Sequence, residues 1–244
     1  MTMTPVPVFE ETRTEIVPQD RLAVVMCVWK RPELLAGTLT MLAAQTDQEF
    51  DLFLVNNNGE LREFVEKTVA ASDLSLKTSV QHNPRNEGSF AKLVMAYDLA
   101  NRERDWIVLI DDDFTFGPTF LAQLRAQRLD DAIVSWRVHT AIPGRNYWER
   151  TKTAVGAAGS YAEGTGTIIP AGAVCDAEIL TLSSEFWPAD NLWMSYIADK
   201  RHYRCVQGDI QGCSLIIDNK DQYIHYTEMK VRFLNYLRGR GWKV

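Results

Sequence analysis

Short strand-like runs, each followed by a polar turn and a segment with helical spacing, alternate through the first half of the sequence. Two of these runs, the first and the last, are apolar at every position, which is typical of strands that are covered on both faces. The runs are Leu22–Trp29, Phe50–Val55, Lys77–His82 and Trp106–Ile110, and helices are expected from Pro32, over Leu61–Ala71 and over Ser89–Asn101. This alternation predicts an α/β fold with a mostly parallel central sheet flanked by helices.

The second half of the sequence is less regular. The stretch 137–166 mixes glycine, aromatic and basic residues with little periodicity, so it predicts long loops, and loops of that length are usually functional. The remaining expected elements are a helix over Asn191–Asp199, short strands near Arg204–Gln207 and Gly212–Ile217, and a final helix over Thr227–Arg238.

Length and composition favour one compact domain. The chain has 244 residues, of which 46% are hydrophobic, enough for one sizeable core. Residues 1–20 carry Thr, Pro and Glu without apolar periodicity and predict an N-terminal arm. The expected domain is then 21–244, with a nucleotide-binding half over 21–116 and an acceptor and catalytic half over 117–244.

Charge and cysteine content narrow the class of protein. A net charge of -6 argues against a large non-specific nucleic-acid footprint. The four cysteines form no CxxC pair, which suggests reduced thiols rather than a disulfide or zinc framework. No apolar run is long enough to cross a bilayer and no secretory leader is recognisable, so we expect a soluble cytoplasmic protein.

Polar clusters follow the expected strands of the first half. In open α/β sheets, ligands bind beyond the carboxyl ends of the strands, because loops and helix N-termini converge there. That edge should gather Lys30 and Arg31, the turn 56–59, the loop 85–88 and the aspartates 111–113.

Asp111, Asp112 and Asp113 directly follow the apolar strand WIVLI. Adjacent carboxylates repel one another, and a hard divalent cation such as Mg²⁺ or Mn²⁺ is the usual compensation, since it accepts carboxylate and phosphate oxygens together. Strand alternation sends Asp111 and Asp113 to one side. The competing interpretation is an acidic turn that caps the next element.

The ordered set VVMCVWKRPELL, LVNNNGE, NPRNEGSFAKLVMAYDLA and VLIDDDF resembles the donor-binding half of GT-A fold glycosyltransferases, especially the family 2 type. The resemblance covers roughly residues 22–230 and rests on the order and spacing of the pieces. It implies a GT-A fold and a metal-dependent, inverting transfer of a sugar from a nucleotide-diphosphate donor to a hydroxyl acceptor.

The resemblance also implies roles for individual residues. Asp111 and Asp113 match the D-x-D motif of the family, so Asp111 would face the donor ribose or the metal and Asp113 would ligate the metal, with Asp112 as a further candidate. The family's C-terminal metal-binding histidine corresponds to His225 in DQYIHYTE. A lone histidine is otherwise more often a core or surface residue.

Two further motifs of the resemblance lie downstream of the aspartates. The glycine-rich loop of the family corresponds to YAEGTGTIIPAG, where Gly164 and Gly166 would let the backbone approach the donor sugar. The acidic helix start of the family corresponds to Asp190 in FWPADNLWMSYIA, with Ala189 where a Glu is usual. Asp190 is the expected general base, and as a structural residue it would serve as an N-cap.

Basic and amide side chains near the strand ends suit a nucleoside diphosphate, although each basic residue could equally be a solvated charge. Asn57 or Asn58 stands where many relatives use an Asp to bind the base, and UDP is the expected nucleotide. The expected donor-binding residues are Lys30, Arg31, Asn57, Asn58, Arg85, Gly88, Lys92, Asp111, Asp112, Gly164 and Gly166. Candidates for an aromatic acceptor wall are Tyr147, Trp148, Tyr161, Trp187 and Trp193, of which we expect one or two in the site.

Other functions stay open at this point. A nucleotidyltransferase on a similar sheet would carry a Gly-rich signature with a basic residue after the first strand, which VWKRPELL lacks. A non-catalytic nucleotide-sugar-binding domain would bind donor and metal without turnover. The acceptor is a saccharide or, as a second option, a hydroxylated base in DNA, whose phosphates would suit Lys230, Arg232, Arg238, Arg240 and Lys243. Those five could also form a solvated helix face.

Overall fold

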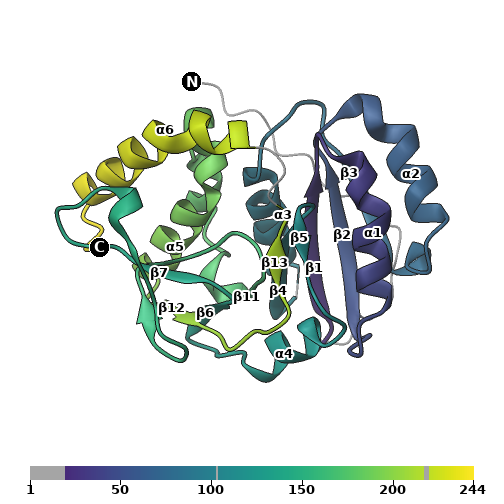
Figure 1. The fold of residues 1–244 in the computed structure, drawn as a ribbon, viewed down its shortest axis with the longest axis horizontal. Coiled ribbons are helices and arrows are strands. Elements are labelled where there is room, and N and C mark those ends of the chain that lie inside the picture. The colour runs from purple at the N-terminus through teal and green to yellow at the C-terminus, as the bar shows by residue number, and fades with distance from the viewer. Residues whose placement is uncertain (1–19, 103, 217–219) are drawn as a thin grey trace.

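An eight-stranded sheet in the order β3-β2-β1-β4-β11-β6-β12-β9 forms the centre of the molecule (Figure 1). The computed structural model describes residues 20–102, 104–216 and 220–244, and of residues 220–225 only the backbone. The strands are β1 (Leu22–Val28), β2 (Phe50–Asn56), β3 (Thr78–His82), β4 (Trp106–Asp111), β5 (Phe114–Thr115), β6 (Ala132–Ser135), β7 (Val138–Thr140), β8 (Thr151–Lys152), β9 (Ala158–Gly159), β10 (Tyr161–Ala162), β11 (Thr167–Pro170), β12 (Arg204–Gln207) and β13 (Ser214–Leu215). The α-helices are α1 (Pro32–Ala43), α2 (Arg62–Ala70), α3 (Phe90–Ala100), α4 (Phe120–Ala126), α5 (Asp190–Lys200) and α6 (Lys220–Gly239).

Alternate residues of each central strand enter two separate cores, one on each face of the sheet. In β1, Val25 packs in the core that α3, α5 and α6 cover, whereas Val24 and Met26 pack in the core that α1, α2 and α4 cover. Burial on both faces explains why the sequence of β1 is an unbroken apolar run. The predicted α/β fold with a mostly parallel sheet between helices is therefore confirmed.

The prediction of long loops over 137–166 was partly wrong. This stretch contains β7, β8, β9 and β10, and the small sheet β10-β7-β8 stands beside the main one. The sequence analysis also missed β6, α4 and β11, and β11 is inserted antiparallel between β4 and β6. Strands of two to four residues are too short for a periodicity to be visible, and they are held by pairing with partners far along the chain.

The carboxyl-terminal helices differ slightly from their predicted bounds. α6 begins at Lys220 rather than near Thr227, and α5 begins at Asp190. Asp190 is the first residue of the helix and Ala189 takes the cap position, so the alternative role of Asp190 as an N-cap was wrong. The predicted arm lies almost wholly outside the described residues.

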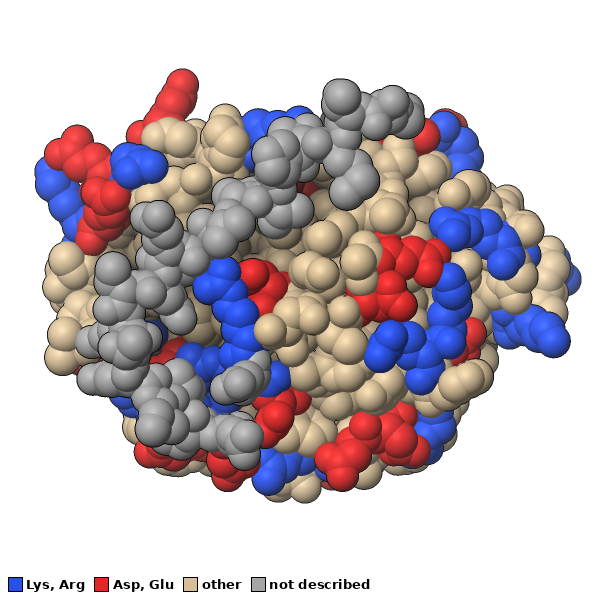
Figure 2. Space-filling model, turned by 180° about the vertical axis from the view of Figure 1, so that it is seen from behind, with Lys and Arg blue, Asp and Glu red and all other residues tan. Residues whose placement is uncertain are grey.

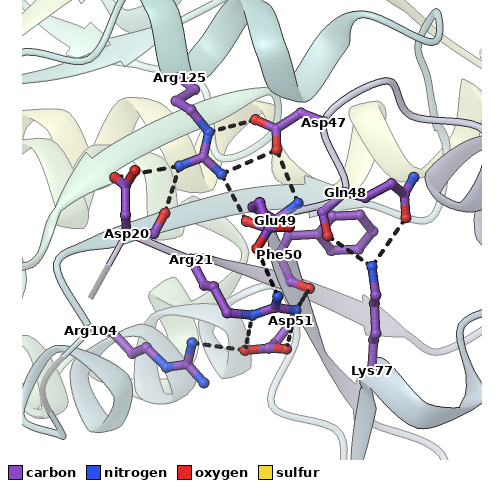
Figure 3. Close-up of polar contacts among 10 residues, drawn as sticks. All are labelled: Asp20, Arg21, Asp47, Gln48, Glu49, Phe50, Asp51, Lys77, Arg104 and Arg125. Atoms are coloured by element: carbon purple, nitrogen blue, oxygen red, sulfur yellow. Dashed lines mark hydrogen bonds and ion pairs between the residues drawn. The ribbon is translucent and has the colours of Figure 1, made fainter. Parts of the chain in front are cut away.

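An ion-pair network ties together the amino-terminal ends of β1 and β2 (Figure 3). Arg21 donates to the Asp51 carboxylate at 2.9 Å, and Arg104 donates to its other oxygen at 2.8 Å. Burial tends to raise the pKa of Asp51, but the hydrogen bonds from both arginines hold it below its usual range. Arg125 of α4 binds Asp47 in the loop before β2. This edge is opposite to the strand ends that carry the aspartates, so its charges are used structurally.

On the face shown in Figure 2, acidic and basic side chains of the described residues are interspersed. Within the described part of the chain, no helix is both long enough and apolar enough to cross a membrane.

Candidate functional site

The carboxyl-terminal ends of β1, β2 and β4 and the amino-terminal end of α3 surround a cavity of about 380 Å³. We call it the donor cavity, after the ligand that the sequence analysis expects at this edge of the sheet. Its lining residues are Cys27, Trp29, Lys30, Arg31, Asn57, Asn86, Gly88, Ser89, Asp111, Asp112, Asp113, Ser184, Trp187, Pro188 and Tyr226. The site therefore lies at the edge of the sheet that the sequence predicted.

A second cavity of about 170 Å³ adjoins the donor cavity, because five residues line both. We call it the distal cavity. Its lining residues are Ser89, Asp111, Asp113, Trp148, Glu163, Gly164, Thr165, Pro188, Asp190, Asn191, Leu215, Tyr226 and Lys230. Glu163 and Lys230 were not singled out as site residues by the sequence analysis, although Lys230 appeared among the C-terminal cations.

The predicted site residues fall into three groups. Those that line one of the two cavities are Lys30, Arg31, Asn57, Gly88, Asp111, Asp112, Asp113, Gly164 and Asp190. Asn58, Arg85, Lys92 and Gly166 line neither, and the side chain of His225 lies outside the described part of the chain. Arg85 lies over the ring of Trp187, at 5.3 Å from the ring centroid, and so stands at the wall of the donor cavity.

Asn57 links the donor cavity to the loop before α3. Its side-chain amide donates to the Gly88 carbonyl at 2.8 Å, and its carbonyl oxygen accepts from Asn83 at 2.9 Å. Gly88 has a φ of +61°, a conformation that other residues adopt only with strain. The loop that carries Gly88 is thus fixed against the end of β2.

The three aspartates carry more negative charge than their surroundings compensate. The pKa of Asp111 is raised to about 6 and that of Asp112 to about 7, mainly by burial and also by the neighbouring carboxylates, while Lys92 and Arg31 oppose the shift. Asp113 pairs with Arg31 at 2.9 Å. The oxygen donors and their uncompensated charge fit a hard divalent cation.

No three carboxylate, imidazole or thiol groups already converge on a common point among the described residues. Asp111 instead faces Lys92 and Asp113 faces Arg31. Binding of a cation would therefore require at least one of these carboxylates to turn from its internal partner.

Lys92 is the internal partner of Asp111. Its side chain is fully buried among the apolar residues of α3, and its ammonium group contacts the Asp111 carboxylate and donates to the Gly164 carbonyl at 2.6 Å. Burial tends to lower the pKa of this ammonium, but Asp111 and Asp190 raise it above its ordinary value. Lys92 thus joins the end of β4 to the glycine-rich loop, from a position behind the cavity rather than within it.

Replacing Lys92 with Met should lower the free energy of unfolding by about 1 to 3 kcal/mol, because the partly exposed Asp111 carboxylate loses its ammonium partner and the Gly164 carbonyl loses its donor. Urea denaturation at neutral pH measures the change. Lys67→Met is the matched control, since Lys67 forms an exposed ion pair with Glu63 and its loss should cost under about 1 kcal/mol. Equal effects of the two substitutions would contradict the structural role of Lys92.

Asp190 lines the distal cavity and is 5% exposed. Its Oδ1 accepts the Ser89 hydroxyl hydrogen bond at 2.7 Å, whereas Oδ2 has no hydrogen-bond partner among the described residues. A Cβ on Gly164 would lie 3.1 Å from Oδ2, so only glycine allows the backbone to pack this closely against the carboxylate. Ser89 was missed by the sequence analysis, although it stands at the start of a predicted helix.

Gly166 serves the packing of the glycine-rich loop. Its φ is +62°, and a Cβ there would lie 2.4 Å from the ring of Trp136. Trp187 lines the donor cavity and Trp148 the distal cavity, whereas Tyr147, Tyr161 and Trp193 are buried in the core. Two of the five aromatic candidates therefore reach a cavity.

Comparisons with known proteins agree with this architecture. The model of the family described as Glycosyl transferase family 2 matches residues 23–180. No curated protein has a significantly similar sequence. Among solved structures, S. aureus TarS superposes with a TM-score of 0.57 at 15% identity over 88% of this chain, and this chain covers 40% of TarS. The portion 1–349 of TarS in complex with UDP gives 0.54 at 15% identity, covering 84% of this chain and 62% of that one.

The mannosyltransferase PcManGT from Pyrobaculum calidifontis, solved in complex with GDP-Man and Mn²⁺, gives a TM-score of 0.62 at 14% identity. The superposition covers 93% of this chain and 68% of that one. At such identities the likeness to the solved structures extends to the GT-A fold. The family match, which spans more than half of the residues, goes further: the chain belongs to glycosyl transferase family 2.

Proposed function

We propose that this protein is a metal-dependent, inverting glycosyltransferase that moves a sugar from a nucleoside-diphosphate donor, with a UDP-sugar as the expected donor, to a hydroxyl acceptor. Family membership supports the reaction type. The binding of UDP by TarS and of GDP-Man with Mn²⁺ by PcManGT supports a nucleotide donor and a divalent cation.

The observation that carries the proposal is the position of Asp190. A buried carboxylate, with one oxygen held by Ser89 and the other without a described hydrogen-bond partner, lines the distal cavity, and Ser89 lines both cavities. An acceptor hydroxyl in the distal cavity could donate its proton to the Asp190 carboxylate while its oxygen attacks the anomeric carbon of a sugar in the donor cavity. The bond from that carbon to the diphosphate breaks as the new bond forms, so the configuration inverts.

Residues of the donor cavity have separate tasks in this proposal. Asn57 holds the Gly88 loop that lines the expected base and ribose site, and Lys30 and Arg31 stand where they can bind the diphosphate. Asp111, Asp112 and Asp113 would hold Mn²⁺ or Mg²⁺, with His225 as a further expected ligand. When bound, the cation supplies positive charge to the diphosphate leaving group.

Donor binding and turnover can be tested separately. UDP-glucose, UDP-N-acetylglucosamine and GDP-mannose are added with and without Mn²⁺, and the melting temperature and the release of nucleoside diphosphate are measured. A donor that binds only the folded state raises the melting temperature. At least one donor should do so when Mn²⁺ is present and not when it is absent, and the protein should slowly hydrolyse that donor in the presence of Mn²⁺. Stabilisation without hydrolysis or transfer would indicate a non-catalytic binding domain, and no stabilisation by any donor would refute the proposal.

A further inference from the structure

Glu163 is a second carboxylate in the distal cavity, held in place by residues that the reaction itself does not use. Its Oε1 is 2.9 Å from His139 Nε2, and the His139 side chain is 7% exposed. The segment is fixed from both sides, because the Glu163 amide donates to the Arg137 carbonyl at 3.0 Å and Thr167 donates to the Glu163 carbonyl at 2.8 Å. The carboxylate thus has a defined position before any ligand binds.

The surroundings of Glu163 keep it ionised. Burial tends to raise the pKa of Glu163, but the hydrogen bond with His139 and the charges of Lys230, His139 and Arg150 lower it to about 2. A carboxylate that holds its proton so weakly is a poor general base and a good hydrogen-bond acceptor. The two carboxylates of the distal cavity, Asp190 and Glu163, therefore suit different tasks.

Negative charge dominates the lining of the distal cavity. Asp111, Asp113, Glu163 and Asp190 line it together with one cation, Lys230, among the described residues, and Glu163 and Asp190 keep the excess negative when Asp111 and Asp113 are engaged with the proposed cation. A carboxylate or phosphate that entered would meet repulsion at short range in a partly desolvated space. An uncharged ligand with several hydroxyls would meet acceptors in the carboxylates and a donor in Lys230.

One wall of the distal cavity offers an aromatic face. Trp148 is 38% exposed and is held by its indole nitrogen, which donates to the Thr227 carbonyl at 3.2 Å, and by an edge contact with Tyr147. Such a face suits the apolar side of a sugar ring.

Two of the C-terminal cations that could have bound DNA phosphates are engaged within the protein. Arg238 donates to the carbonyls of Arg145 and Ile142, and Arg240 pairs with Glu178.

We propose that the distal cavity is an acceptor site for an uncharged saccharide, and that Glu163, positioned by His139, selects this acceptor by accepting a hydrogen bond from one of its hydroxyls. This inference rests on the proposed function, because it places the donor in the neighbouring cavity. A hydroxylated base in DNA is the competing acceptor.

The test compares three acceptor classes with the donor that the enzyme hydrolyses. The probes are the methyl glycosides of glucose, galactose and mannose, the corresponding glucuronic and galacturonic acids, and an oligonucleotide that contains 5-hydroxymethylcytosine. At least one methyl glycoside should raise nucleoside-diphosphate release above the rate of hydrolysis and yield a glycosylated product, and should do so better than its uronic acid.

The variant Glu163→Gln should raise the KM for that methyl glycoside by about 10-fold, with the KM for the donor changed far less, since a charged hydrogen-bond acceptor is replaced by a weaker neutral one. It should also reduce the ratio of the transfer rate to the methyl glycoside over the transfer rate to the corresponding uronic acid. Glu66→Gln is the matched control, because Glu66 likewise contacts a histidine, His82, at 3.2 Å, but at the far edge of the sheet. A neutral preference that persists in Glu163→Gln would overturn the role of this residue.

The outcomes separate the two proposals. Absence of donor binding and hydrolysis would remove the proposed function itself. Hydrolysis of the donor with no transfer to any methyl glycoside, or with transfer to the oligonucleotide alone, would leave the function in place and overturn the saccharide acceptor.

Discussion

Replacing Asp190 with Asn should lower the turnover number by about 10³-fold and leave the dissociation constant of the donor nearly unchanged. The amide has the same shape as the carboxylate and can still accept the Ser89 hydroxyl hydrogen bond. It cannot take the proton of the acceptor hydroxyl. Steady-state rates of nucleoside-diphosphate release, together with donor titration by calorimetry, separate the two quantities.

Asp199→Asn provides the matched control for this experiment. Asp199 lies on the same helix, α5, but is exposed near its carboxyl-terminal end. Its replacement should leave turnover within a factor of about two. Near-normal turnover of Asp190→Asn would rule out this residue as the base.

Replacing Asp113 with Ala should abolish the stabilisation that donor and Mn²⁺ produce together. For the wild type, that stabilisation is about 2.7 kcal/mol at a ligand concentration of 100 Kd. Asp113 is partly exposed and pairs with Arg31 at 2.9 Å, so its loss should change the unliganded protein much less. Melting curves with Mn²⁺ alone, donor alone and both together measure the effect.

Asp130→Asn is the control for the aspartate experiment, since Asp130 is exposed in the turn before β6. It should keep the full shift in melting temperature. If Asp113→Ala kept the shift as well, the cation would have to be bound by other residues.

The sequence predicted the parallel half of the sheet well because each strand there carries its own signal. β1 and β4 are apolar at almost every position since both faces are buried, and that pattern is visible without knowledge of the partners. β11 carries no comparable signal. Its four residues follow the glycine-rich loop, and they form a strand only because β4 and β6 offer open edges on both sides.

The site residues also fall into those that the sequence could predict and those that it could not. The aspartates and Asn57 follow recognisable strands, so their place at one edge could be inferred from topology alone. Lys92 was expected to bind the diphosphate, but its side chain is buried. It interrupts the apolar face of α3, and that place in the sequence already indicated burial. Glu163 directly follows β10, and Lys230 lies on α6. Only the tertiary structure brings these two residues together.

A crystal structure of the protein with UDP and Mn²⁺ tests the central claim most directly. We expect the diphosphate in the donor cavity beside Arg31 and Mn²⁺ bound to Asp113. At least one aspartate should have turned away from its internal partner. UDP bound elsewhere, with Asp111 still on Lys92 and Asp113 still on Arg31, would contradict it.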